Sequence, residues 1–236
     1  YKTLSRSNAG IAYAQAGHFT QAREWTNDGM EKAKMMSDEL TRKRMTAYSY
    51  LASGYIEKEA GNYEKSEQFE EAVKLYETMK MPFNLYVAHK GKLLNHLALG
   101  KGAELERQIP LTLQLIEDYR AKILEEQERA SFLDIEESVY DIAADYEFGN
   151  GKYEQAYNYT EISNSRSLLD WLQKGAKISG GKQKLEILLE DNATPLPLAE
   201  IRERMPEGAQ ILQYTVLENK VLIWLVSKEK FAVVPV

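Results

Sequence analysis

The sequence predicts a mostly α-helical chain of about four helical hairpins, followed by a small α/β segment that ends in an antiparallel strand meander. The helical part is predicted by a motif of glycine, any residue, aromatic, any two residues and a small residue. This motif begins at Gly17, Gly61 and Gly151. The strand part is predicted by the β-branched and aromatic residues that dominate the chain after Gly208.

The three glycines are regularly spaced. Gly61 follows Gly17 by 44 residues and precedes Gly151 by 90, or two steps of 45. A degenerate copy is therefore expected near Gly100 and Gly102, and such spacing is typical of helical repeats. In each unit the glycine would end the first helix, because it adopts a left-handed conformation at little cost. The aromatic residue would fill the gap between the two helices.

Close approach of the paired helices is expected at small residues. These lie seven positions before the glycine, at Gly10, Gly54 and Ala144. The predicted helix pairs cover roughly 3–16 with 20–36, 37–60 with 63–80, 83–99 with 103–123, and 127–148 with 153–172. Pro110 falls inside one predicted helix, where proline predicts a kink or a new helix start.

The last part of the chain changes character after Leu172. A loop with a possible short helix covers 175–196, and a short helix is predicted over 198–205. Strands are predicted over 209–217 and 221–227 and from Phe231 onward. A meander this small needs further strands or covering helices, so we expect the chain to be a piece of a longer protein.

The repeated motif resembles the tetratricopeptide repeat (TPR) family. The first unit matches the family's positions at Gly10, Tyr13, Gly17, Phe19 and Ala22, the second at Gly54, Gly61, Tyr63 and Ser66, and the fourth at Gly151, Tyr153 and Ala156. Glu57 stands where the family has tyrosine, and the period exceeds the usual ~34 residues. The resemblance implies a right-handed α-solenoid over 1–174 whose concave face binds a protein or peptide.

The following stretch resembles the start of a CHAT domain, the caspase-like peptidase domain found attached to TPR arrays. The resemblance rests on 165–172, on the Leu-x-x-Ile helix that starts at Leu198, and on the strands after it. It implies a linker over 175–196 and a truncated CHAT-like domain over 197–236. The family would supply a cysteine peptidase with a His–Cys dyad. No cysteine occurs in the chain, and its histidines all lie in the repeat region, so no catalytic residue is expected here.

Composition narrows the functional classes further. With no cysteine, the chain has no disulfide, thiol nucleophile or Cys-ligated metal. A net charge of −6 disfavours nucleic-acid binding, and no apolar run is long enough to span a membrane. We expect a cytoplasmic protein without cofactor or metal. His89 and His96 are seven residues apart, whereas metal-binding pairs on helices more often have a spacing of four.

The candidate partner-binding residues lie where first helices of TPR units line the concave groove. They are Tyr48, Leu51, Tyr55, Lys58, Glu59, Ser138, Asp141 and Asp145. Tyrosine, acidic and amide groups there would suit an extended peptide or a partner helix. Alternatively, the groove is filled by another segment of the parent protein. The acidic residues Glu137, Asp141 and Asp145 share a face that is either a patch for a basic peptide or simply solvated.

Three functions follow from these observations. The leading one is a protein-interaction or sensor scaffold that lacks enzymatic activity. The second is a regulatory fragment of a caspase-like cysteine peptidase whose dyad lies beyond residue 236. The third is a structural adaptor whose strands exchange with those of a partner.

Overall fold

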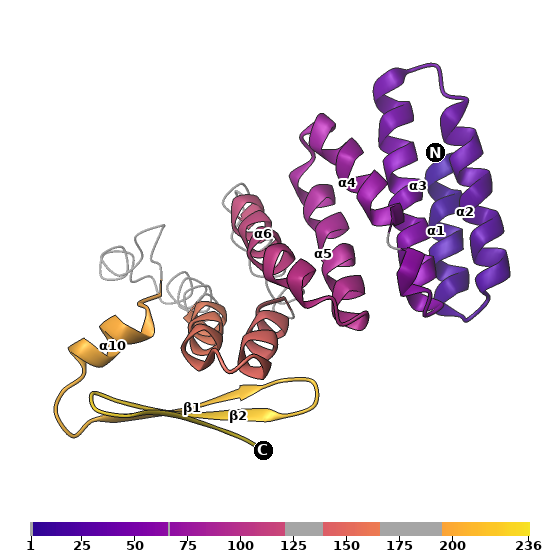
Figure 1. The fold of residues 1–236 in the computed structure, drawn as a ribbon. Coiled ribbons are helices and arrows are strands. Elements are labelled where there is room, and N and C mark those ends of the chain that lie inside the picture. The colour runs from indigo at the N-terminus through magenta and orange to yellow at the C-terminus, as the bar shows by residue number, and fades with distance from the viewer. Residues whose placement is uncertain (1, 66, 121–138, 166–194) are drawn as a thin grey trace, which may run out of the picture. The chain divides into compact units, whose positions relative to one another are not determined.

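The computed structural model describes residues 2–65, 67–120, 139–165 and 195–236. It is mostly helical, with a small three-stranded antiparallel sheet at the C-terminus (Figure 1). The chain divides into two compact units, Tyr1–Lys122 and Ile123–Val236. Among the described helices, none combines the length and the apolar character that crossing a membrane requires.

The first unit consists of consecutive helical hairpins. Its helices are α1 (Lys2–Gln15), α2 (Phe19–Lys34), α3 (Glu39–Glu59), α4 (Glu67–Met79), α5 (Pro82–Ala98) and α6 (Gly102–Arg120), with the short 3₁₀ helix η1 (Tyr63–Lys65) before α4. Each helix packs against the next, and α3 also packs against α1 and α5. The helices predicted for the first three helical repeats are thus present, with ends that differ by a few residues. Helix α6 continues through Pro110, so this proline starts no new helix.

The turns within the hairpins share one backbone arrangement. At the second turn the Asn62 N–H donates to the Glu57 carbonyl at 2.8 Å, and the Gly61 N–H donates to the Lys58 carbonyl at 3.0 Å. The same pair of bonds recurs at the other three turns, and each central glycine has a positive φ; these glycines are Gly17, Gly61, Gly100 and Gly151. This is the Schellman motif, which satisfies carbonyls at the end of the first helix. The third turn therefore lies at Gly100, giving steps of 39 and 51 residues rather than two equal steps of 45.

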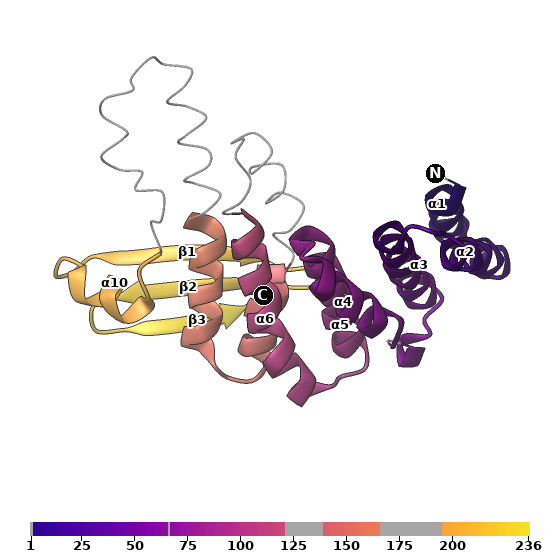
Figure 2. The ribbon, with the colours of Figure 1, turned by 90° about the horizontal axis from the view of Figure 1, so that it is seen from above.

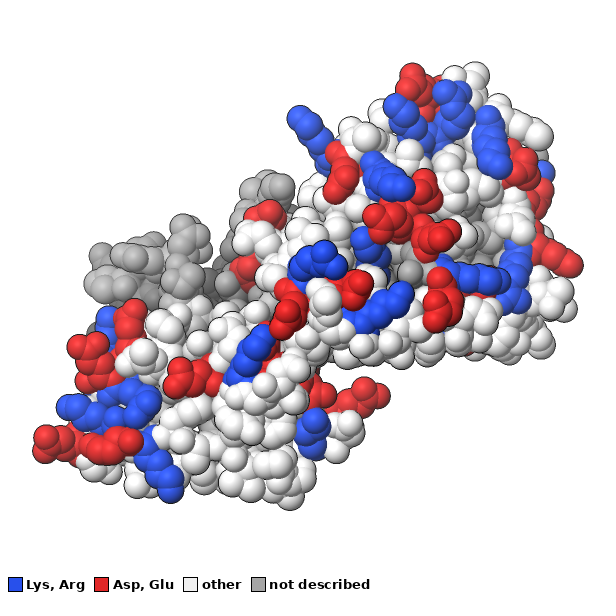
Figure 3. All heavy atoms as spheres, in the orientation of Figure 1, with Lys and Arg blue, Asp and Glu red and all other residues white. Residues whose placement is uncertain are grey.

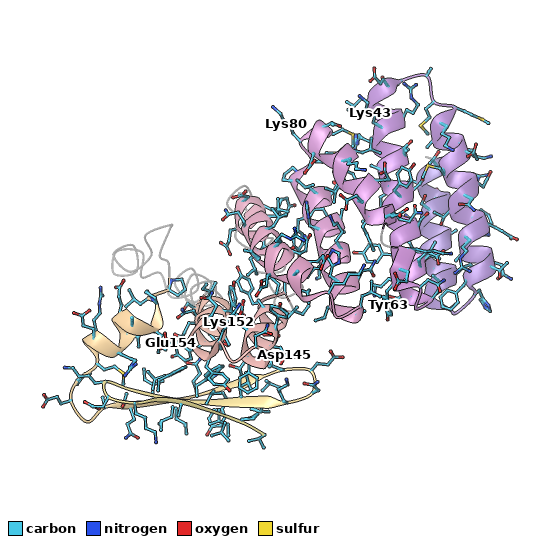
Figure 4. The ribbon with its side chains drawn as sticks, viewed as in Figure 1. Lys43, Tyr63, Lys80, Asp145, Lys152 and Glu154 are labelled. Atoms are coloured by element: carbon cyan, nitrogen blue, oxygen red, sulfur yellow. The ribbon has the colours of Figure 1, made fainter. Side chains whose placement is uncertain are left out.

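The turn between α4 and α5 has the same form without glycine. Lys80 (Figure 4) takes its central position with φ 52°, and the Met81 N–H donates to the Tyr76 carbonyl at 3.3 Å. A non-glycine residue in this left-handed region is unfavourable because its Cβ crowds the backbone.

Phe69 is the central aromatic residue of the first unit and is fully buried. It lies between α3 and α5, at Gly54 and Gly91. A Cβ atom on Gly54 would lie 2.8 Å from the ring, and one on Gly91 would lie 2.3 Å from it. At Gly54 the space is thus taken by the Phe69 ring and not by the backbone of α4. The predicted close approach is confirmed at Gly10, where a Cβ would lie 2.8 Å from the Ala22 carbonyl oxygen on α2. Gly91 was not anticipated.

The aromatic residues directly after the turns fill the helix gaps only in part. Phe19 is partly buried and packs against Ala14, Ala22 and Ile56, as predicted. Tyr63 is partly buried, and Tyr153 is 46% exposed. In the second helical repeat the gap between helices is filled by Phe69, because the glycines on both neighbouring helices leave room for its ring.

A buried polar cluster joins α5 to α6. The Gln108 side-chain amide lies 2.8 Å from His89 Nδ1 and donates to Thr112 Oγ1 at 3.1 Å. All three residues are buried. Burial, aided by the nearby Lys92 charge, lowers the pKa of His89 to about 4, so the imidazole is neutral at pH 7.

The second unit joins the fourth hairpin to the sheet. Helices over 139–149 and 153–165 are followed by α10 (Leu198–Arg204), β1 (Gln210–Val216), β2 (Val221–Ser227) and β3 (Phe231–Pro235). The strands lie side by side in chain order and are antiparallel (Figure 2). The predicted meander is thus confirmed.

One face of the sheet packs on the helix over 153–165. Trp224 is fully buried, and its ring meets that of Tyr157 edge-on with centroids 5.5 Å apart. The Trp224 Nε1–H donates to Thr215 Oγ1 at 2.8 Å, and the Thr215 hydroxyl donates to Thr160 Oγ1 at 3.3 Å. Ala156 belongs to the same core. The boundary predicted between 1–174 and 197–236 therefore separates elements that share one core, because the fourth hairpin supplies part of the sheet's packing surface.

The opposite face of the sheet is apolar and exposed. Its most exposed side chains are Leu212 (56%), Tyr214 (57%), Val216 (74%), Val234 (57%) and Val236 (75%). The strand register places Leu212, Tyr214 and Val216 opposite Leu225, Ile223 and Val221, which are partly buried. Contiguous apolar surface of this kind is typical of a face that contacts another element or molecule.

Candidate protein-interaction site

The predicted groove residues of the second helical repeat lie on α3, but they differ in accessibility. Tyr48 is partly buried, and its hydroxyl donates to Asn8 Oδ1 on α1 at 2.5 Å. Tyr55 is also partly buried and meets the Phe69 ring edge-on at 5.5 Å. Leu51 is only 5% exposed and belongs to the core, so it offers no surface to a partner. Helices α1 and α3 therefore contribute to one face, with Tyr48 between them.

The C-terminal end of the α3 face carries two opposite charges. Lys58 Nζ lies 2.6 Å from Glu59 Oε1, and the two side chains are 24% and 43% exposed. An exposed pair between neighbouring residues contributes little to stability, so both groups can exchange this contact for one with a charged ligand.

The predicted groove residues of the fourth helical repeat are differently placed. Ser138 lies outside the described residues. Asp145 lies beside the sheet (Figure 4), and its Oδ1 is 2.5 Å from Nζ of Lys220 in the β1–β2 turn. The Lys220 ammonium also lies 5.6 Å from the centre of the Phe148 ring. Asp141 is partly buried. In the fourth repeat, therefore, the β1–β2 turn of the same chain already contacts part of the predicted groove face.

A pocket of ≈ 520 Å³ lies on the other side of α3, between α2 and the start of α4. Tyr50 and Ser53 line it, and each follows a predicted groove position by two residues. Two residues of an α-helix turn through about 200°, so these side chains point away from the Tyr48–Leu51 face. Helix α2 supplies another wall, and further lining residues come from α3, η1 and α4. These residues are Arg23, Asn27, Met30, Glu31, Lys34, Ile56, Glu57, Lys65 and Gln68.

Glu57 anchors the end of this pocket. Its carboxylate accepts hydrogen bonds from Arg23 Nε at 2.7 Å and Nη2 at 3.0 Å, and from Asn62 Nδ2 at 2.7 Å. Lys65 Nζ lies 3.8 Å from its Oε2. The Arg23 hydrogen bond, opposed by partial burial, lowers the pKa of Glu57, which is therefore ionised at neutral pH. The network joins α2, α3 and η1.

Sequence reasoning treated Glu57 only as a departure from the family's tyrosine. Its main partner, Arg23, is 34 residues away in the chain, so no local spacing indicates the pair. The pocket residues Asn27, Ser53 and Gln68 were likewise missed, because isolated polar residues on helices have no distinctive pattern.

Metal binding finds no support in the described ranges, which contain no group of three or more His, Asp or Glu side chains that could hold an ion. His89 is engaged by Gln108. His96 is partly buried, and burial lowers its pKa. On the face shown in Figure 3, positive and negative side chains are interspersed rather than gathered into a basic patch.

Comparison of the chain with protein-family models, with curated proteins and with solved structures finds no match.

Proposed function

We propose that this chain is a protein-interaction scaffold, a TPR-like right-handed solenoid that binds a peptide or protein partner on the face formed by α1 and α3. The observation that carries the proposal is the succession of hairpins α1–α6, closed by turns of one kind and packed each against the next. Stacked hairpins present a long surface made of side chains from several helices, and such surfaces serve mainly for binding.

The α1–α3 face has the chemistry that an extended peptide needs. Tyr48 and Tyr55 provide partly buried aromatic surface, which costs little conformational entropy when a ligand packs on it. Lys58 and Glu59 supply both charges at the end of the same face. A ligand of mixed polarity would therefore find apolar and charged contacts along one helix.

A peptide-display selection on the purified chain tests this proposal. Enriched peptides are synthesised, and their affinities for wild type, Lys58→Glu and Lys43→Glu are measured by fluorescence anisotropy. Lys43 is the control, because it pairs with Glu39 on the same helix but lies 15 residues before Lys58, or about 22 Å along the helix axis. We expect Lys58→Glu to weaken binding about fivefold or more and Lys43→Glu to leave it unchanged. Failure to enrich any peptide over scrambled sequences, or equal affinities for all three proteins, would refute the proposal.

A second candidate is the regulatory part of a caspase-like cysteine peptidase. The observation that favours it is the apolar outer face of the sheet, which suits a sheet with further elements packed on it. This candidate predicts that the 236-residue chain cleaves no peptide, whereas the full gene product does. Peptide turnover by the chain itself, or none by the full product under any activating partner, would argue against it.

A further inference from the structure

We propose that the pocket between α2, α3 and α4 binds the carboxylate of an acidic residue in a partner peptide. This site lies on the opposite side of α3 from the face proposed above. The two proposals can therefore fail independently.

The pocket has the size and the floor of a small-ligand site. Its volume of ≈ 520 Å³ falls within the roughly 300–1,000 Å³ of typical ligand pockets. Ile56, which is 1% exposed, and Met30 give it an apolar floor. Methylene groups of a bound side chain would pack there, while the polar groups of the walls fix its end.

The ionised side chains leave one positive charge uncompensated. Three cations and two carboxylates line the pocket, namely Arg23, Lys34, Lys65, Glu31 and Glu57. Lys34 pairs with Glu31 at 2.7 Å, and Arg23 pairs with Glu57 through two hydrogen bonds. Lys65 is the remaining cation. It lies 3.8 Å from Glu57, beyond hydrogen-bond distance, and its side chain is 61% exposed. The charge that complements the pocket is therefore a single negative one.

The hydrogen-bonding side chains of the pocket match a carboxylate that is flanked by peptide groups. Glu57 already accepts three hydrogen bonds, so the Lys65 ammonium keeps its donors for a ligand. Asn27, Tyr50, Ser53 and Gln68 line the same space. Within the described part of the chain, the side chains of these four residues form no hydrogen bond with one another or with other groups.

Side-chain amides and hydroxyls both donate and accept, and therefore match the N–H and C=O groups of a peptide backbone. A carboxylate on a peptide would satisfy Lys65 and these groups together. A free carboxylate would satisfy Lys65 alone.

Nuclear magnetic resonance of the ¹⁵N-labelled chain provides a direct test. The side-chain NH₂ signals of Asn27 and Gln68 are followed during titration with three probes: N-acetyl-glutamate N-methylamide, its glutamine analogue and sodium acetate. Ionic strength is held constant. We expect the glutamate probe to shift both signals with an affinity about three to five times that of the glutamine probe, as an exposed charge contact would give. Acetate should bind more weakly than the glutamate probe.

Matched lysine variants then locate the charge. Lys65→Gln removes the uncompensated cation, whereas Lys74→Gln removes a lysine of equal exposure that pairs with Glu71 outside the pocket. We expect Lys65→Gln to abolish the preference for glutamate over glutamine and Lys74→Gln to preserve it.

Several results would overturn this inference. These are equal binding of the two peptide probes, acetate matching the glutamate probe, or the same loss in both variants, which would indicate general attraction to a charged surface. The Lys58→Glu protein should bind the glutamate probe normally, which separates this site from the α1–α3 face.

Discussion

Replacement of Gly91 by alanine tests the packing of Phe69 between α3 and α5. The added Cβ would lie 2.3 Å from Phe69 Cε1 and 2.6 Å from Cδ1 and Cζ, whereas ordinary carbon contacts begin near 3.4 Å. The ring must therefore move by about an ångström. On its other side it has little space, because a Cβ on Gly54 would also lie 2.8 Å from it.

The expected cost follows from two opposing effects. Overpacking a well-packed core costs about 1–3 kcal/mol. Alanine is favoured over glycine in a helix by about 1 kcal/mol, which offsets part of that cost. We therefore expect Gly91→Ala to lower the free energy of unfolding by roughly 0–2 kcal/mol. Urea unfolding followed by far-UV circular dichroism measures this change.

A control and a double variant separate the clash from helix propensity. Gly149 has nothing within 4 Å of its hypothetical Cβ, so Gly149→Ala should leave stability unchanged or raise it slightly. In a Phe69→Leu background the clash partner is smaller, and Gly91→Ala should cost less than in wild type. Stabilisation by Gly91→Ala, or an equal cost in both backgrounds, would refute the clash.

Three further changes have expected outcomes. Lys80→Gly should stabilise the first unit by about 0.5–1 kcal/mol, measured as a higher melting temperature, because glycine adopts the left-handed conformation of Lys80 without strain. The pKa of His89 is lowered from 6.5 to about 4, so its contribution is present above pH 6.5 and is lost as pH falls toward 4. Wild type should lose up to about 3 kcal/mol over that window, measured by urea titration, and His89→Asn should show a flatter profile. Ala156→Leu should destabilise the second unit by about 1–3 kcal/mol and leave hydrogen exchange in α1–α4 unchanged, because Ala156 is fully buried beneath the sheet.

The sequence predicted best those features that depend on neighbouring residues. A Schellman turn is built from residues of one short segment, so Gly17, Gly61 and Gly151 located three hairpins, and Gly100 was anticipated only approximately because its unit lacks the aromatic signature. The strands were equally clear, because β-branched and aromatic residues dominate them.

Features that depend on distant residues could not be predicted in this way. Leu51 fell on the expected groove face but is buried, since its exposure is set by the elements packed on α3. Asp145 is paired with Lys220, 75 residues further along the chain. The Arg23–Glu57 pair and the pocket beside it arise in the same way, from helices brought together by hairpin stacking.

The hydroxyl of Thr215 helps to determine which face of the sheet packs on the helix over 153–165. Both faces of the sheet are largely apolar, so hydrophobic alternation alone does not decide which face meets the helix over 153–165. A slip of β1 by one residue would exchange its two faces and replace Thr215 by an apolar or aromatic neighbour. The buried Trp224 indole would then lose its acceptor, and Thr160 would lose the hydrogen bond from Thr215. The Tyr157 hydroxyl would lose its acceptor, Gln213. The polar side chains of Thr215 and Gln213, rather than apolar burial, thus distinguish the native register from its nearest competitor.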